Sequence, residues 1–288
     1  MFLKTFLKQR KSTMSRGNSH VVIYSSIFLL CALLVSLPSR AGDWQVEGLE
    51  FERVVVVGDV EVEIKQGDAV ELMVRGSNSD LEKRPFYQDG DTLILGSDSS
   101  HGSDFGRLRF KLTVVDIEHL QLNGSGEVYV KPLVVEDLYV SVDGSGEIKL
   151  FGVRGRDITL KVSGSGDAQV VKLDGSEVKM LVSGSGDLHI GEISAEAIDA
   201  SLSGSGDISI DKGSDVAEIE INIVGSGDID MENVEAQQVS VNIVGSGSAL
   251  VNVIDELDCN IMGSGDVLYN GKPKVSQSVL GSGDVERQ

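Results

Sequence analysis

Apolar and polar residues alternate along most of this chain, around a motif that recurs every 18 to 21 residues. The motif is Gly-Ser-Gly and it occurs nine times, with its first glycine at Gly124, Gly144, Gly164, Gly184, Gly204, Gly225, Gly245, Gly263 and Gly281. Two residues before that glycine every repeat carries Leu, Val or Ile, and four residues after it every repeat carries Val, Ile, Leu or Ala. A period of two is typical of β-strands. Each repeat therefore predicts a strand, a tight corner, a second strand and a more variable return.

These repeats predict an all-β fold, a single-domain β-solenoid (β-helix) whose coils of about 20 residues turn on Gly-Ser-Gly-Asp/Glu corners. Equivalent residues of neighbouring coils would then stack ~4.8 Å apart. The alternative is an antiparallel meander in which each motif is a hairpin turn. Hairpins do not need the same residue at the same place in every unit, so the faithful repetition favours the solenoid. Val182, Leu202 and Ile223 are then expected to be buried and stacked on one another.

The corner itself favours glycine for two reasons. One backbone position is expected to have a positive φ, and neighbouring corners are expected to approach closely.

The chain divides into residues 1–41, a predicted signal peptide, and residues 42–288, the predicted solenoid. Within the solenoid, residues 42–116 are expected to form irregular N-terminal coils, with strands near 51–57, 60–64 and 70–74, and residues 117–288 the regular repeats. Residues 96–106 have the composition of a loop. Glu118 and Gln277 replace inward apolar residues and are expected to mark the terminal coils. No segment predicts a helix longer than a turn or two.

The N-terminal segment has the three parts of an export signal. A basic stretch without acids contains Lys4, Lys8, Arg10, Lys11 and Arg16. The apolar run 21–37 follows, and Ser-Arg-Ala at 39–41 supplies small residues for cleavage before position 42. A membrane anchor is the alternative, because the run lies at the lower length limit of a span. Met14 is an alternative start. Cys31 belongs to the apolar run and follows Leu30, where lipidation would need a small residue.

The mature chain is strongly acidic. Removing residues 1–41 takes away six of the 25 Lys and Arg and none of the 45 Asp and Glu, which leaves a net charge of −26 (19 − 45). Such a field repels nucleic acid. Cys259 becomes the only cysteine, so no intramolecular disulfide can form. It occupies a position that other repeats fill with apolar residues, and we expect a buried core thiol.

The chain resembles the bacterial family of autotransporter adhesins with a head GIN domain. The resemblance rests on the opening Phe-Glu-Arg-Val-Val-Val at 51–56, the repeated Gly-Ser-Gly-Asp corners, and the ending Tyr-Asn-Gly-Lys-Pro at 269–273. It implies an exported envelope protein with a β-helical fold, an adhesin-like role and no assigned catalysis. No separate translocator barrel is evident in the sequence.

The residue after each motif is acidic in eight of nine repeats. If the repeats stack, these side chains form a column that includes Glu127, Glu147, Asp167, Asp187, Asp207 and Asp228. Adjacent carboxylates would repel by ~1 kcal/mol even at the dielectric constant of water. One explanation is that each carboxylate accepts backbone N–H groups of its own corner. The other is a row of Ca²⁺ or Mg²⁺ ions held by oxygen ligands.

A second column lies one residue before each motif, where the side chain should point outward. It is polar from Asn123 to Ser203 and then becomes apolar at Val224, Val244, Met262 and Leu280. Soluble monomers seldom leave such a stripe open. Either the corner turns these residues inward or the tail covers them, or they form a protein–protein contact such as self-association. Beside them Asn222, Asn242 and Asn260 are expected to form an amide ladder.

The sequence identifies no catalytic, cofactor-binding or firm metal-ligating residue. Catalysis needs an asymmetric group of side chains with unlike roles, whereas polar positions here repeat uniformly. His101, His119 and His189 have no metal-binding spacing and are expected at the surface or in loops. Arg53 and the Lys83-Arg84 pair are candidates for an anion or polysaccharide contact, or simply solvated charges.

These observations predict an exported binding or scaffold module of the periplasm, the outer-membrane surface or the extracellular space. Its expected partner is a glycan or an envelope or surface protein, not nucleic acid, and no membrane span remains after cleavage. The alternatives are a structural spacer and a polysaccharide-acting β-helix enzyme.

Overall fold

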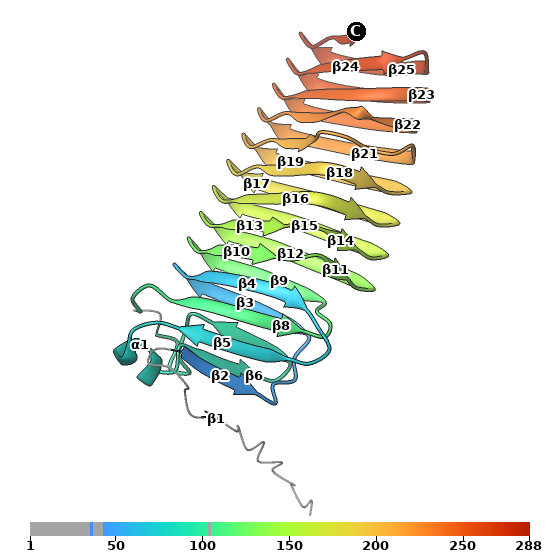
Figure 1. Cartoon of the computed structure of the whole chain (residues 1–288). Coiled ribbons are helices and arrows are strands. Elements are labelled where there is room, and N and C mark those ends of the chain that lie inside the picture. The colour runs from blue at the N-terminus through green and yellow to red at the C-terminus, as the bar shows by residue number, and fades with distance from the viewer. Residues whose placement is uncertain (1–34, 37–42, 103–104) are drawn as a thin grey trace, which may run out of the picture. The chain divides into compact units, whose positions relative to one another are not determined.

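The computed structural model describes residues 35–36, 43–102 and 105–288. The predicted signal peptide, with Met14 and Cys31, lies outside these residues except for β1 (Val35–Ser36). The described residues belong to one compact unit, and most of it is a stack of parallel β-coils (Figure 1). Within the described ranges, no helix has the length and apolar character of a membrane-spanning one.

Each regular coil places one strand before its Gly-Ser-Gly corner and one after it. The strands that end at a corner are β9 (His119–Gly124), β12 (Asp137–Gly144), β15 (Asp157–Gly164), β17 (Glu177–Gly184), β19 (Ala197–Gly204), β21 (Val216–Gly225) and β25 (Lys274–Gly281). The strands that follow a corner are β10 (Glu127–Val130), β13 (Glu147–Leu150), β16 (Asp167–Asp174), β18 (Leu188–Ser194), β20 (Ile208–Ile210), β24 (Asp266–Gly271) and β26 (Val285–Arg287). β22 (Ile229–Gly245) and β23 (Ser248–Gly263) run from one corner to the next. β11 (Leu133–Val134) and β14 (Val153–Arg154) are short strands in the returns.

Parallel pairing in register confirms the solenoid and excludes the meander. Gly164 lies opposite Gly144 in one neighbouring coil and Gly184 in the other. The same register continues through every later corner to the pair of Gly263 and Gly281. Differences in coil length are absorbed in the returns, where β22 and β23 shift register between Met231 and Gln238.

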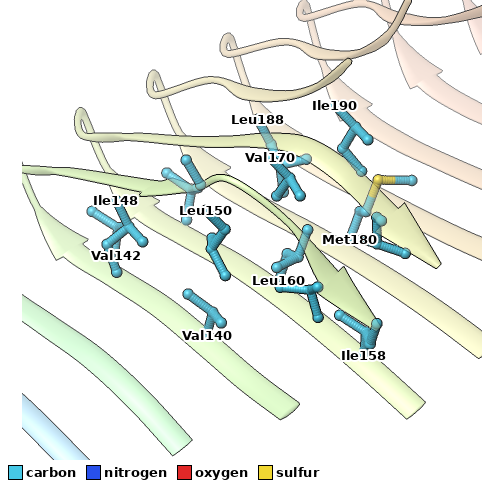
Figure 2. Close-up of a cluster of buried hydrophobic side chains, with 14 of the residues drawn as sticks. Val140, Val142, Ile148, Leu150, Ile158, Leu160, Val170, Met180, Leu188 and Ile190 are labelled. Atoms are coloured by element: carbon cyan, nitrogen blue, oxygen red, sulfur yellow. The ribbon is translucent and has the colours of Figure 1, made fainter. Parts of the chain in front are cut away.

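Like apolar residues stack to form the core. Val182, Leu202 and Ile223 lie opposite one another in successive coils and are 2%, 1% and 1% exposed, as the sequence predicts. Figure 2 shows other members of the same core, such as Val140 and Leu160 from the strands before a corner and Ile148 and Val170 from the strands after one. The two periodic apolar positions of each repeat therefore fill the space between the two strands of a coil.

The corner needs both of its glycines. Gly204 has a φ of +135°, and a Cβ on it would overlap the carbonyl oxygen of Gly184 one coil away. Gly206 has no such backbone angle, but a Cβ there would overlap the carbonyl oxygen of Gly186. The first glycine is thus required by conformation and contact, and the second by contact alone.

The N-terminal coils stack in an order that differs from the sequence. β3 (Arg53–Gly58) pairs with both β9 and β7 (Thr92–Leu95), while β4 (Glu61–Gln66) pairs with both β10 and β8 (Arg109–Val114). The β3–β4 coil therefore lies between the later β7–β8 coil and the first regular coil. The expectation that Glu118 marks a terminal coil is wrong, because two coils lie beyond it.

Antiparallel strands cover the N-terminal end of the stack. β2 (Asp43–Glu47) pairs with β5 (Glu71–Arg75), which pairs with β8, and β6 (Phe86–Asp89) pairs with β7. Residues near 70–74, expected in a coil, thus belong to this cap. α1 (Asn78–Glu82) is a single short helix beside it.

Candidate functional site

The acidic residues after the corners form a continuous exposed column. Glu127 lies opposite Glu147, and Glu147 opposite Asp167. All six predicted members are exposed. Hydrogen bonds from the backbone N–H of one acidic residue to the carboxylate of the one before it extend the column through Asp187, Asp207 and Asp228.

From Asp167 to Asp266 each aspartate of the column accepts a hydrogen bond from the next coil. Oδ1 of Asp167 accepts the backbone N–H of Asp187 at 3.0 Å, and Oδ1 of Asp187 accepts that of Asp207 at 2.9 Å. Three further contacts continue the series at 2.7–2.9 Å: Asp207 with Asp228, Asp228 with Ser248, and Asp266 with Asp284. The expectation that each carboxylate caps its own corner is therefore wrong for these aspartates. Because equivalent residues sit one above another, the N–H within reach is that of the next coil.

The glutamates at the start of the column behave differently. The backbone N–H groups of Glu147 and Asp167 donate to the carbonyl oxygens of Gly126 and Gly146, both at 3.0 Å. Oε2 of Glu127 accepts the phenol of Tyr129 at 2.9 Å. This hydrogen bond to a carboxylate raises the pKa of Tyr129. Asp and Glu are thus not equivalent in the column. The Asp carboxylate accepts the backbone N–H of the next acidic residue, whereas after a Glu that N–H donates to a glycine carbonyl oxygen.

The column begins one coil earlier than the Gly-Ser-Gly motif indicates. Glu61 lies opposite Glu127 and forms an ion pair with Arg109 at 2.6 Å. The Gly-Ser-Gly motif does not predict Glu61, because the corresponding corner reads Gly-Asp-Val from Gly58, although Gly58 lies opposite Gly124. The alternating apolar residues at 60, 62 and 64 are the sequence feature that could have predicted a strand after this corner, with Glu61 in the column.

Backbone capping offsets part of the repulsion in the column without a cation. Among the residues the structure describes, no three or more His, Cys, Asp or Glu side chains are grouped so that they could hold a metal ion. The Ca²⁺ row stays a prediction that metal removal can test.

The apolar stripe at the C-terminal coils points outward. Val224, Val244, Met262 and Leu280 lie opposite one another in successive coils and are 54%, 48%, 56% and 70% exposed. The alternative that the corner turns them inward, or that the tail covers them, is therefore wrong. We call these four residues the apolar stripe.

The predicted amide ladder runs beside the stripe. Nδ2 of Asn242 donates to Oδ1 of Asn222, and Nδ2 of Asn260 donates to Oδ1 of Asn242, both at 3.2 Å. In each strand the Asn stands two residues before the stripe residue, so both columns lie on one outward face. The ladder holds the Asn side chains in place beside the stripe.

The histidines do not form a common site. His101 is exposed in the loop, with a φ of 66°, as expected. His119 is instead half-buried in β9 and stacks on Tyr139 with ring centroids 4.8 Å apart. Burial lowers the pKa of His119, the Arg53 charge lowers it further, and Asp143 opposes them. Its Nδ1 has no hydrogen-bond partner among the described residues.

His189 contacts two polar side chains on an outward face. Its Nδ1 lies 2.9 Å from Oγ of Ser209, and its Nε2 lies 3.2 Å from Oδ2 of Asp211. These residue types occur together in serine hydrolases. The side chains of His189 and Asp211 are 36% and 64% exposed, so water competes for this contact. No local sequence motif predicts this group, because His189 lies one coil away from Ser209 and Asp211.

The remaining candidates are separate from one another. Cys259 is 2% exposed, and burial, with the nearby charge of Asp258, raises its pKa to about 12. The predicted core thiol is confirmed. Arg53 lies in β3, whereas Lys83 follows α1 and stands over the ring of Phe105 at 5.6 Å.

Comparisons with known proteins agree with this architecture. The model of a family described as "Putative auto-transporter adhesin, head GIN domain" matches residues 50–217 and, in an overlapping second match, residues 159–273. The overlap reflects the repeats. No curated protein matches the chain.

Several solved structures share the fold. A protein of Parabacteroides merdae ATCC 43184, titled a putative adhesin, is 20% identical, with a TM-score of 0.64 over 85% of this chain and 95% of that one. Two proteins of Parabacteroides distasonis ATCC 8503 are titled a putative lipid binding protein and a putative adhesin. They are 23% and 21% identical, and each match has a TM-score of 0.62 and covers 85% of this chain and 96% of the other.

Proposed function

Because this chain belongs to the family described as "Putative auto-transporter adhesin, head GIN domain", we propose that it is an exported binding module of the bacterial envelope that acts by adhesion, not catalysis. Residues 1–41 would direct export and be removed. The mature module would then work in the periplasm, on the outer-membrane surface or outside the cell. Its net charge of −26 (19 − 45) would keep it from nucleic acid.

The observation that carries the proposal is the exposed apolar stripe. Four exposed apolar side chains in line on one face of a sheet form a surface that gains free energy when a partner covers it. The stacked strands and the amide ladder hold this surface in one conformation before binding, which reduces the entropy lost on association. Its aliphatic character favours a protein surface over a glycan, since glycan sites usually depend on aromatic side chains and this stripe has none.

The experiment is a binding panel with purified residues 42–288. The probes are a glycan array, purified extracellular-matrix proteins such as collagen and fibronectin, and phosphatidylcholine vesicles. The last probe is included because a structural relative is titled a putative lipid binding protein. The test variant replaces Val224, Val244 and Met262 with Ser. The control variant replaces Val134 and Val171 with Ser, which are 60% and 44% exposed elsewhere on the solenoid.

We expect at least one probe to bind, binding to be lost in the test variant, and binding to be retained in the control. Absence of binding to every probe would favour a structural spacer, and equal binding by both variants would exclude the stripe. Incubation with polyuronate and with a fluorophosphonate probe tests the enzyme alternative. Shortened polyuronate, or labelling that is lost in Ser209→Ala, would overturn the non-catalytic proposal.

A further inference from the structure

The last coil of the stack has an unpaired edge. Among the described residues β25 pairs only with β23, and β26 pairs only with β24. At the other end, antiparallel strands cover the first coils. Within residues 105–288 the C-terminal coil has no comparable cover. An open strand edge is a template for pairing with another strand.

The core is also open at this edge. The inward positions of β25 are Val275, Gln277 and Val279, which lie opposite Leu257, Cys259 and Ile261 of β23. Those three residues of β23 are 0%, 2% and 2% exposed, whereas Val279 is 38% exposed and Gln277 is also exposed. The seven residues after Gly281 do not cover β25, because β26 continues the other sheet in register with β24.

The sequence of this edge is a palindrome. Residues 275–279 read Val-Ser-Gln-Ser-Val. In an antiparallel pair, directly opposite residues lie on the same face of the sheet. If two copies of β25 pair about a two-fold axis at Gln277, Val275 faces Val279 of the second copy, Ser276 faces Ser278, and Gln277 faces itself. Inward residues thus lie opposite inward residues, and Val pairs with Val, Ser with Ser and Gln with Gln. A two-fold interface is self-complementary in this way.

We propose that two copies of this protein associate end to end through antiparallel pairing of β25 about Gln277. The pairing would satisfy the free edge of β25, cover the inward side chains of β25 in both copies and join the two Gln side chains by amide hydrogen bonds. The charged residue of the edge fits this arrangement. Lys274 is paired with Glu256 of its own chain at 3.0 Å, and its aliphatic stem would lie against Leu280 of the second copy, which is 70% exposed.

Cysteine cross-linking tests the register directly. Opposite residues of an antiparallel pair have Cα atoms roughly 4.5–5.5 Å apart, within the range of a disulfide. Ser276 and its own copy would be about 8 Å apart, from a rise of ~3.4 Å per residue and a strand spacing of ~4.8 Å. This separation is too long for a disulfide. Native Cys259 is buried and should not react.

With oxidised glutathione, we therefore expect Gln277→Cys to cross-link with itself. Ser276→Cys and Ser278→Cys should not cross-link alone, but should do so when the two proteins are mixed. Equal cross-linking of Ser276→Cys alone would overturn the register.

The oligomeric mass of the full protein tests the association itself. Light scattering over a range of concentrations should show a dimer. Gln277→Lys places two like charges opposite each other and should weaken the dimer by on the order of tenfold or more, whereas Gln277→Leu should keep it. Circular dichroism and melting curves verify the fold of each variant. A strictly monomeric wild type, or a Gln277→Lys variant that dimerises like the wild type, would refute the proposal.

This inference shares only Leu280 with the apolar stripe, and its test variants keep it apart from the proposed adhesion. The Val224, Val244 and Met262 to Ser variant should still dimerise, and the Gln277→Lys monomer should still bind any probe that the stripe recognises. Failure of one proposal is therefore distinguishable from failure of the other. If a strand of another protein were the natural partner of this edge, the pure protein would be monomeric. That result would contradict the proposal.

Discussion

The substitution Gly204→Ala tests how the coils stack. An alanine there must adopt a φ of +135°, and its Cβ would overlap the carbonyl oxygen of Gly184. A sparsely populated backbone conformation costs about 1–3 kcal/mol, and overpacking typically adds about 1–3 kcal/mol. The neighbouring coils cannot easily move apart, since eight residue pairs join β17 to β19. We expect a loss of stability of about 4 kcal/mol.

Two other glycines separate the causes. Gly206→Ala meets the same kind of overlap, with the carbonyl oxygen of Gly186, but has no positive φ, so it should lose less than Gly204→Ala. Gly152→Ala is the matched control, because the nearest atom to its Cβ would be Cβ of Pro132 at 3.5 Å. It should be neutral or slightly stabilising, since alanine restricts the unfolded chain.

The assay is thermal unfolding of residues 42–288 followed by circular dichroism. A loss of about 4 kcal/mol should lower the Tm of a domain of this size by roughly 8–16 °C. If Gly204→Ala melts together with the wild type and Gly152→Ala, the close approach of the corners is wrong. If Gly206→Ala loses as much as Gly204→Ala, the contact and not the backbone angle dominates.

Three further predictions concern the core, a histidine and cations. Leu202→Ala should cost roughly 2–4 kcal/mol in denaturant unfolding, because Leu202 is 1% exposed between Val182 and Ile223; a loss below about 1 kcal/mol would contradict its place in the core. His119 has a pKa below its usual 6.5 in the folded state, so it binds a proton more readily in the unfolded state. The contribution of His119 to stability therefore falls as pH drops below about 6.5. His119→Phe should keep the stacking on Tyr139 and reduce this loss of stability. If the variant shows the same difference in Tm between pH 7.5 and pH 5 as the wild type, His119 does not cause the loss. If the acidic column acts only through backbone capping, the Tm should be the same in EDTA and in millimolar Ca²⁺, whereas a Tm that EDTA lowers and Ca²⁺ restores would establish the cation row.

The regular coils were predictable because their information is local and repeated. A corner glycine, an inward apolar residue on each side and a fixed period specify both the strands and their register, and every Gly-Ser-Gly corner obeys them. The exposure of the apolar stripe followed from the same alternation, since Val224 stands one residue from the inward Ile223.

The order of the N-terminal coils was not predictable in this way. β3 and β7 are both short apolar strands, and the sequence of neither strand indicates which of them pairs with β9. The partner of a strand in a stack is chosen by the packing of the whole end, including the antiparallel strands β2 and β5. Local patterns therefore gave strands but not their order.

The acidic column shows a third kind of limit. The sequence identified its members, but a carboxylate can cap its own corner or the next one with equal local justification. Only the coil spacing places Oδ1 of Asp187 within 2.9 Å of the N–H of Asp207. The Ser209, His189 and Asp211 group was missed for the same reason, since His189 and Ser209 meet only because their coils are adjacent.

Hydroxyl-radical footprinting of the protein bound to a probe from the panel tests the central claim most directly. Met262 lies in the stripe and Met73 lies in the N-terminal cap, 56% and 39% exposed, so each reports on its own end of the described structure. We predict that the bound probe protects Met262 from oxidation, together with Val224 and Val244, and leaves Met73 as reactive as in the free protein. Protection of Met73 with an unchanged Met262 would contradict the account, because binding would then occur away from the C-terminal face.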